Sequence, residues 1–204
     1  MKSWVWITGG IFFVIFMAVM IVGGWAVGTY NNLQTGDEKV STAFAEVTNQ
    51  YQRRADLVPS LVSVVQGYAT HEKSTLLGVT QARASATSIT MTPQMLNNAE
   101  AMAKFQAAQS QLSGFLSRLL VASENYPDLK ADKQFIALQA QIEGTENRIT
   151  VARNRYITTV NDWNLLVRKF PGSLMAGMFN YSVKPNFMVD NIKEIDKAPK
   201  IEFK

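Results

Sequence analysis

Two groups of charged side chains are the best candidates for chemistry in this sequence. They are Arg53, Arg54 and Asp56 in one segment and Glu143, Glu146, Asn147 and Arg148 in another. Each group falls in the middle of an apolar pattern with helical spacing, so we expect the two groups to face each other as a polar layer between packed helices. A buried arginine requires a carboxylate partner, because an uncompensated buried charge destabilises a fold by several kcal/mol.

Within this layer we expect Arg54 to be buried, because it stands between Tyr51 and Val58 in the apolar series. Two interpretations follow. In the first, the layer fixes the register of the helices. In the second, Arg54, Glu143 and Glu146 form a sensor site for a small molecule or a metal, since inward-facing carboxylates of helical bundles can hold metals. No histidine stands beside these carboxylates, so we favour the structural layer and expect no cofactor or metal.

Nucleophilic and metal catalysis both depend on one residue here, because the chain contains a single histidine, His71, and no cysteine. The run that starts at His71 resembles the His-Glu-x-x-His helix of zinc proteases, but Thr75 stands where the second histidine is required. Any serine nucleophile would need the same His71 as its base. We therefore expect an exposed histidine on a helix surface and a protein without enzymatic activity.

The charge pattern argues against a nucleic-acid partner. The formal net charge is +4, but the basic residues are scattered, and adjacent pairs occur only at Arg53–Arg54 and Arg168–Lys169. A site that follows a phosphate backbone needs clustered lysine and arginine, so we expect a solvated surface.

The element that carries the second charged group is a long helix over residues 135–170. Apolar and small residues recur there in alternating steps of three and four, which indicates a narrow stripe over about five heptads. The stripe consists of Phe135, Leu138, Ile142, Thr145, Ile149, Ala152, Tyr156, Thr159, Trp163, Leu166 and Phe170. Asp132 is a suitable N-cap, and Pro171 with Gly172 ends the helix.

Two further long helices are predicted over residues 93–123 and 37–84, and for the second, continuity with the membrane helix is left open. Thr92–Pro93 marks the start of the former, because proline is favourable at the first position of a helix. Pro59 lies inside the latter and should kink or break it near residues 57–58.

Short connections at residues 85–91 and 125–128 make neighbouring helices antiparallel. The predicted fold class is therefore all-α: an N-terminal transmembrane helix, an elongated antiparallel bundle of three long helices over residues 37–170, and a short C-terminal segment, helical or irregular, over residues 171–204.

The N-terminal segment predicts a membrane anchor over residues 1–36. Residues 3–36 carry no charge, and about 20 apolar residues suffice to cross the hydrocarbon core as a helix. Trp6 and Trp25 would lie about 28 Å apart on that helix, which matches two interfacial belts. A cleaved secretory signal has an apolar region of only about 7–15 residues, so we favour a retained single-pass anchor in a bacterial inner membrane.

Two features of the anchor bear on orientation and assembly. Lys2 precedes the apolar run and favours an amino terminus inside, with the bundle on the periplasmic side. Gly24 and Gly28 form a Gly-xxx-Gly pair, which allows two helices to approach closely and predicts self-association.

The C-terminal tail carries several aromatic and apolar residues outside the helical pattern, among them Met178, Phe179, Tyr181 and Phe187. We favour a tail that folds back over the end of the bundle. The alternative is a docking segment for a neighbouring subunit, a partner protein or lipid headgroups.

Several motifs of the chain resemble the LemA family of bacterial membrane proteins. The motifs are Tyr30-Asn31-Asn32-Leu33, Tyr51-Gln52-Arg53-Arg54-Ala55-Asp56-Leu57-Val58-Pro59, Gly67-Tyr68-Ala69-Thr70-His71-Glu72, Glu124-Asn125-Tyr126-Pro127-Asp128, Glu143-Gly144-Thr145-Glu146-Asn147-Arg148, Val151-Ala152-Arg153-Asn154-Arg155-Tyr156 and Arg168-Lys169-Phe170-Pro171. They cover nearly the whole chain in the order typical of the family. Residues 181–191 depart from it, because they lack the usual aromatic and acidic ending.

The resemblance implies a membrane helix that carries an antiparallel helical bundle, without catalytic residues. It also implies a scaffold or accessory role. Genomic neighbours of family members often include membrane quality-control proteins, such as TPM-domain proteins and HtpX-like proteases, as candidate partners. We therefore expect a non-enzymatic membrane scaffold that forms homo-oligomers and binds other membrane proteins.

Overall fold

The longest element, α1, is one continuous helix from Lys2 to Tyr68. The structure is a computed structural model and describes residues 2–69, 72–90 and 92–187. The other elements are α2 (Lys73–Ser88), the 3-10 helix η1 (Pro93–Asn97), α3 (Ala99–Ser123), α4 (Pro127–Ala131), α5 (Lys133–Arg168) and α6 (Gly172–Met178). All regular elements within these described ranges are helical, which confirms the predicted all-α class.

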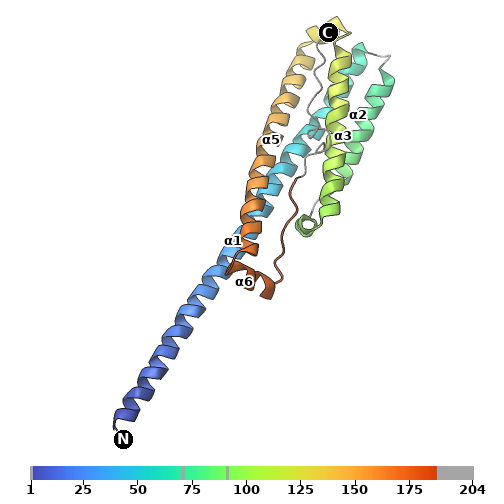
Figure 1. The fold of residues 1–204 in the computed structure, drawn as a ribbon. Coiled ribbons are helices and arrows are strands. Elements are labelled where there is room, and N and C mark those ends of the chain that lie inside the picture. The colour runs from blue at the N-terminus through green and yellow to red at the C-terminus, as the bar shows by residue number, and fades with distance from the viewer. Residues whose placement is uncertain (1, 70–71, 91, 188–204) are drawn as a thin grey trace, which may run out of the picture.

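Four helices pack side by side in the upper part of the molecule (Figure 1). α1 rises from the N-terminal end, α2 returns, α3 rises again, and α5 runs back beside α1. The contact between α1 and α5 is the most extensive in the molecule. The elongated antiparallel bundle behind a long apolar helix is therefore as predicted, with α2 as a shorter fourth member.

The predicted limits of the helix over residues 37–84 are wrong: α1 is continuous with the apolar segment, passes through Pro59 without a break and ends at Tyr68, and a separate helix, α2, follows. A proline inside a helix leaves the carbonyl four residues earlier without its usual donor. Here that carbonyl belongs to Ala55, and it accepts a hydrogen bond from Arg83 Nε on α2 at 2.8 Å. The neighbouring helix thus satisfies the group that Pro59 leaves free, so the helix does not need to break there.

The turn after Tyr68 has a reason in packing. α2 buries Leu76, Val79, Ala82 and Ala86, and its main partners are α3 and α1. If the first helix continued straight to residue 84, these side chains would project beyond the bundle into solvent. Reversal of the chain between α1 and α2 buries them instead.

Side-chain caps fix the starts of α3 and α5. The Asp132 carboxylate accepts from the backbone N–H of Phe135, as predicted. α3 begins at Ala99 rather than at Pro93, because Asn98 accepts from the N–H groups of Glu100 and Ala101. Pro93 instead starts the separate 3-10 turn η1.

The buried side of α5 follows the predicted stripe over its first half and then shifts by one residue. Phe135, Ile142, Thr145, Ile149, Ala152 and Tyr156 are buried, but the next buried positions are Val160, Trp163 and Val167. Phe170, at the end of the predicted stripe, is 82% exposed. A straight helix has 3.6 residues per turn, so a stripe with a strict seven-residue repeat drifts off the packed side, and the extra step of four at Val160 restores it.

The apolar interior forms two clusters that meet near Arg54. The upper core cluster runs from Val58 toward the α1–α2 turn and includes residues of α1, α2, α3, α4 and α5. The lower core cluster runs from Leu33 to Tyr51 on α1 and includes Phe105, Tyr156, Trp163 and Phe187. α2 is too short to reach the lower cluster, where η1, α6 and the segment after α6 complete the packing.

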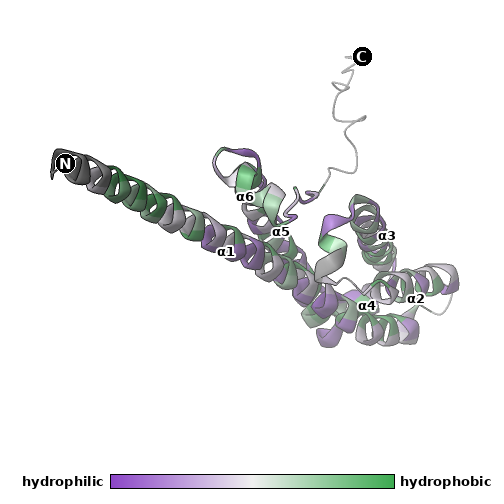
Figure 2. Cartoon of the chain, turned by 90° about the horizontal axis from the view of Figure 1, so that it is seen from below, coloured by the Kyte–Doolittle hydropathy of each residue, from purple (hydrophilic) through white to green (hydrophobic). Residues whose placement is uncertain are grey.

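The N-terminal part of α1 projects from the bundle with its apolar side chains exposed, from Ile11 to Val27. Figure 2 shows hydrophobic colour along this part of α1 and polar colour where α1 enters the bundle. Among the described residues, α1 is the one helix that is both long and apolar enough to cross a membrane.

Candidate functional site

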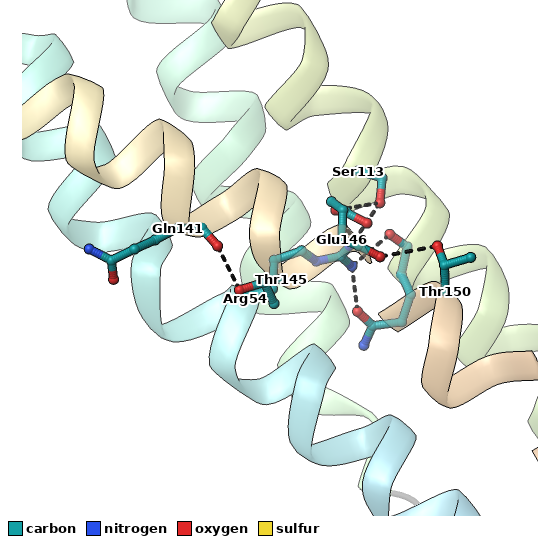
Figure 3. A network of polar contacts seen from close by, with 7 residues as sticks. Arg54, Ser113, Gln141, Thr145, Glu146 and Thr150 are labelled. Carbon is teal, nitrogen blue, oxygen red and sulfur yellow. Dashed lines mark hydrogen bonds and ion pairs between the residues drawn. The ribbon is translucent and has the colours of Figure 1, made fainter. Parts of the chain in front are cut away.

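Arg54 is the centre of the most connected polar group of the bundle, with a side chain that is 1% exposed. Its Nη1 donates to Glu146 Oε1 at 2.7 Å and to Ser113 Oγ. Its Nη2 donates to the side-chain oxygen of Gln109 at 2.8 Å and to the Gln109 backbone carbonyl at 3.1 Å. Figure 3 shows Glu146 and Ser113 next to each other on one side of the guanidinium. We call these four residues the Arg54 layer.

The Arg54 layer joins all four helices of the bundle. Arg54 comes from α1, Gln109 and Ser113 from α3, and Glu146 from α5. Gln109 extends the network to α2, because its Nε2 donates to the backbone carbonyl of Ala86 at 3.3 Å. Arg54 and Gln109 together therefore connect the four helices by hydrogen bonds at the level between the two apolar clusters.

The electrostatics of the layer are those of a compensated buried cation. Glu146 supplies one full negative charge and is 39% exposed, so water reaches the carboxylate but not the guanidinium. The Tyr51 ring adds a cation–π contact, with its centroid 5.1 Å from Arg54 Cζ. Arg54 Nε has no hydrogen-bond partner among the described residues. Nη1 donates to Glu146 and Ser113, and Nη2 donates twice to Gln109. All the Nη donors of Arg54 thus have acceptors within the layer, so they do not bind an incoming anion.

The structure brings together only two members of the predicted polar layer, Arg54 and Glu146. The remaining five are exposed on the outer faces of their helices, namely Arg53, Asp56, Glu143, Asn147 and Arg148. Three of these bond to their own helix: Asp56 accepts from Gln52, Glu143 accepts from Gln139, and Arg148 donates to Thr145.

The predicted sensor site included Glu143 as well as Glu146. In the structure Glu146 pairs with Arg54, whereas Glu143 is exposed and accepts a hydrogen bond from Gln139. Among the described residues, no group of three or more histidines, aspartates or glutamates is arranged to hold a metal ion. His71 lies outside the described residues.

Sequence reasoning missed Gln109 and Ser113, the contribution of α3 to the layer. A signal was present: in the apolar series of α3, Gln109 occupies the position between Phe105 and Leu112 where another apolar residue is expected. A polar residue in an apolar stripe indicates a buried polar partner on a neighbouring helix.

A cavity of about 300 Å³ opens beside the Arg54 layer. Its lining includes Tyr51, Ala55, Phe105 and Gln109, together with the residues that follow α2. Two of these, Tyr51 and Gln109, also contact Arg54. The cavity and the layer are thus connected through shared side chains.

A second buried cation, Lys184, attaches the tail to the lower core cluster. Its Nζ lies 2.8 Å from Asp37 Oδ1 and 3.2 Å from Asn97 Oδ1, and it stands 5.6 Å from the Trp163 ring centroid. Its backbone N–H and C=O both bond to the side chain of Asn164. Nothing in the sequence singled out this lysine, because its partners come from three distant segments.

The four predicted docking residues of the tail divide into two pairs. Phe187 is buried against Tyr156, and Tyr181 packs against Trp163, with ring centroids 5.2 and 5.4 Å apart. Burial raises the pKa of the Tyr181 hydroxyl, and Tyr30 and Asp37 raise it further. Met178 and Phe179 remain exposed. The described part of the tail, residues 171–187, therefore folds back along the bundle, and α6 keeps one apolar face exposed.

Gly24 and Gly28 lie on the exposed part of α1, and a Cβ atom at either position would meet nothing within 4 Å. No part of the described chain covers this pair, so its face is open to another helix.

The fold and the layer define a class of protein: an all-α bundle, braced by a buried arginine, behind one long apolar helix. The LemA family model matches residues 43–203, so the chain belongs to the LemA family. The matched segment includes the whole Arg54 layer and begins beyond the apolar part of α1. A comparison with curated proteins gives no match.

Proposed function

We propose that this chain is a non-enzymatic, single-pass protein of the bacterial inner membrane, which holds a rigid helical scaffold at the membrane surface, self-associates and binds other membrane proteins. The observation that carries the proposal is the continuity of α1. The same helix provides the exposed apolar segment and one wall of both core clusters. No flexible linker separates the anchor from the bundle, so the bundle moves with the anchor as one body.

The packing around Tyr30 favours a retained anchor over a cleaved signal. Ala26 and Tyr30 pack against the lower core cluster, and the Tyr30 ring lies 4.7 Å from the Phe179 ring, centroid to centroid. Ala26-Val27-Gly28 resembles the small-x-small site at which secretory signals are cleaved. Cleavage after Gly28 would remove Ala26 from that contact and cut the helix at the edge of the bundle. Intact mass measurement of protein purified from membranes tests this, and a mature form that begins near residue 29 would refute the anchor.

A periplasmic position of the bundle rests on the single lysine before the anchor. The chain contains no cysteine, so one cysteine introduced at the exposed Val151 gives a unique label. Val151→Cys should react with a membrane-impermeant maleimide in intact spheroplasts. Reaction only after lysis would place the bundle in the cytoplasm.

The scaffold role requires partners, and two surfaces are available for them. Gly24 and Gly28 leave one side of the anchor open to a second copy. The long outer faces of α1 and α5 carry exposed charges suited to reversible contacts. From the family resemblance, the candidate partners are membrane quality-control proteins of the TPM-domain and HtpX-like kinds.

Two measurements test this role. Native mass spectrometry of the detergent-solubilised full chain should give a defined homo-oligomer, and a monomer at all concentrations would contradict self-association. Crosslinking in native membranes, followed by affinity capture, should enrich membrane proteins over a single-pass control with an unrelated soluble domain. Equal recovery from the two baits would contradict the scaffold role.

The cavity beside the Arg54 layer favours a second candidate function, the sensing of a small molecule. A ligand in this cavity would contact Gln109 and Tyr51 and could act on the helix register through Arg54. A thermal-shift screen of the full chain and of Gln109→Leu tests it. A sensor predicts a compound that raises the Tm of the wild type but not of the variant, and equal shifts in both proteins would argue against this site.

A further inference from the structure

α6 presents an apolar face that the rest of the described chain leaves uncovered. Leu174 and Met178, four residues apart, are 56% and 69% exposed, and Phe170 and Phe179 flank them at 82% and 48%. The opposite side of the same helix buries Met175 and Ala176 in the lower core cluster. A short amphipathic helix with one fixed side and one exposed apolar side is a candidate for an interface.

The position of α6 is set by two rigid contacts. Phe179 packs on Tyr30 of α1, with ring centroids 4.7 Å apart. Gly172 lies so close to the Leu166 carbonyl of α5 that a Cβ atom would collide with it. α6 is therefore packed against the end of α5 and beside α1, as Figure 1 shows.

The contact with Tyr30 places α6 at one end of the apolar segment of α1. Exposed apolar side chains run along α1 from Ile11 to Val27, which is about 24 Å of helix axis. Tyr30 lies about 7–8 Å beyond Trp25 along that axis, within the depth of a headgroup layer. If the apolar segment spans the hydrocarbon core, α6 is at the height of the bilayer surface.

α6 and the glycine pair occupy opposite sides of α1. At 100° per residue, Gly24 and Gly28 lie roughly 140–180° around the helix from Ala26 and Leu33, which pack in the lower core cluster. They lie roughly 120–160° from Tyr30, which contacts Phe179 at the end of α6. A second copy that packs on the glycines would therefore leave the apolar face of α6 uncovered.

The charges next to α6 match an anionic surface. Arg168 and Lys169 are exposed at the end of α5, immediately before Phe170. No acidic residue occurs between Asp162 and Asp190 in the sequence. Basic side chains near a membrane surface attract anionic headgroups, while neighbouring apolar side chains enter the acyl boundary.

We infer that α6 is a membrane-interface helix: Phe170, Leu174 and Met178 insert at the boundary between headgroups and acyl chains of the bilayer that α1 spans, and Arg168 and Lys169 bind anionic phospholipid headgroups. The inference rests on the proposed anchor. It adds a second contact between bundle and bilayer, on one side of α1. Two contacts fix the tilt and rotation of the bundle relative to the membrane, which one helix alone does not.

The test uses the full chain in vesicles of phosphatidylethanolamine and phosphatidylglycerol, with a fluorescent probe on single cysteines. Met178→Cys reports on α6, Phe16→Cys on the middle of the apolar segment, and Val121→Cys on the far end of the bundle. Lipids with a doxyl quencher high on the acyl chain then measure contact with the bilayer. We expect quenching of the probe at 178 to exceed that at 121 by roughly threefold, as for a side chain about 5–10 Å into the interface.

The outcomes separate the inference from the proposed anchor. Strong quenching at 16, with equal weak quenching at 178 and 121, would overturn the interface helix and leave the anchor intact. Absence of quenching at 16 would overturn both. A probe at 178 that is shielded from aqueous iodide but not quenched by lipid would mean that protein covers α6, and this also overturns the inference.

Matched variants give a second measurement. Phe170→Gln with Leu174→Gln, both at exposed positions, should lower quenching at 178 toward the value at 121. Arg168→Gln with Lys169→Gln should lower it only in vesicles that contain phosphatidylglycerol. Equal quenching with and without phosphatidylglycerol in the unmodified background would refute the role of the two basic residues.

Discussion

Arg83 Nε on α2 donates a hydrogen bond to the backbone carbonyl of Ala55 on α1 at 2.8 Å. Ala55 is the residue whose carbonyl Pro59 leaves without a helical donor. The hydrogen bond that α1 lacks at Pro59 is thus replaced by a hydrogen bond from a neighbouring helix. This pairing explains how α1 passes through a proline without ending.

Arg83→Ala should lower the free energy of unfolding by about 1–2 kcal/mol, because a buried carbonyl loses its donor. The matched background is Pro59→Ala, which restores a backbone N–H to the same carbonyl. In that background Arg83→Ala should cost clearly less, and chemical denaturation of the four proteins measures the coupling. An equal cost in both backgrounds would mean that Arg83 stabilises the fold by some other contact.

Glu146→Ala should destabilise the protein by about 2–3 kcal/mol, since it leaves the Arg54 guanidinium without its counter-charge; the partial exposure of Glu146 keeps the loss below that of a fully buried pair. The control is Glu143→Ala, three residues away and exposed, for which we expect a change within about 0.5 kcal/mol. Denaturant titration of both variants decides, and similar losses would remove the case for a structural role of the layer.

Lys184→Ala should release the segment after α6 while the helices stay folded. The substitution removes the contacts with Asp37, Asn97 and Trp163 together, a loss of about 2 kcal/mol, or roughly 30-fold in the opening equilibrium. Hydrogen exchange of residues 181–187 measures it directly. Lys169→Ala, at an exposed position, is the control, and unchanged exchange in Lys184→Ala would contradict the role of Lys184.

Replacement of Asp132 by Asn should make the stability that this N-cap gives to α5 independent of pH. The N–H of Phe135 and then the hydroxyl of Tyr68 donate to the Asp132 carboxylate and hold its pKa below the ordinary value. Its contribution to stability is therefore complete above the unfolded pKa of about 4 and is lost as the pH falls through the lower folded pKa. Asparagine still caps the helix but does not titrate.

The difference in Tm between wild type and Asp132→Asn should consequently shrink as the pH falls from 7 to 3. A difference that stays constant over this range would show that the charge of Asp132 does not stabilise α5.

Gly24→Leu and Gly28→Leu should reduce self-association without disturbing the bundle, because a Cβ atom at either position meets nothing within 4 Å in the described chain. Gly9→Leu is the control on the same helix, also in open space. The oligomer fraction in native mass spectra should fall only for the first two. An unchanged fraction would move the association surface elsewhere.

Much of the fold was predictable from local pattern alone. The limits of α5 follow from Asp132 and Pro171, and the apolar segment of α1 follows from composition, because caps, proline geometry and membrane-length hydrophobicity act over one or two turns. The burial of Arg54 and a carboxylate partner from the group around Glu143 and Glu146 were also predicted; the structure pairs Arg54 with Glu146 and leaves Glu143 exposed.

Tertiary structure decided the rest, where the energy of a residue depends on a partner far away in sequence. Pro59 is harmless only because Arg83 lies opposite, and the place where α1 ends depends on burial of the α2 side chains against α3. Gln109 completes the Arg54 layer, and Lys184 fixes the tail through three separate segments. A sequence pattern records which side chains seek burial or a counter-charge, whereas the partner that satisfies each of them is settled only when the helices pack.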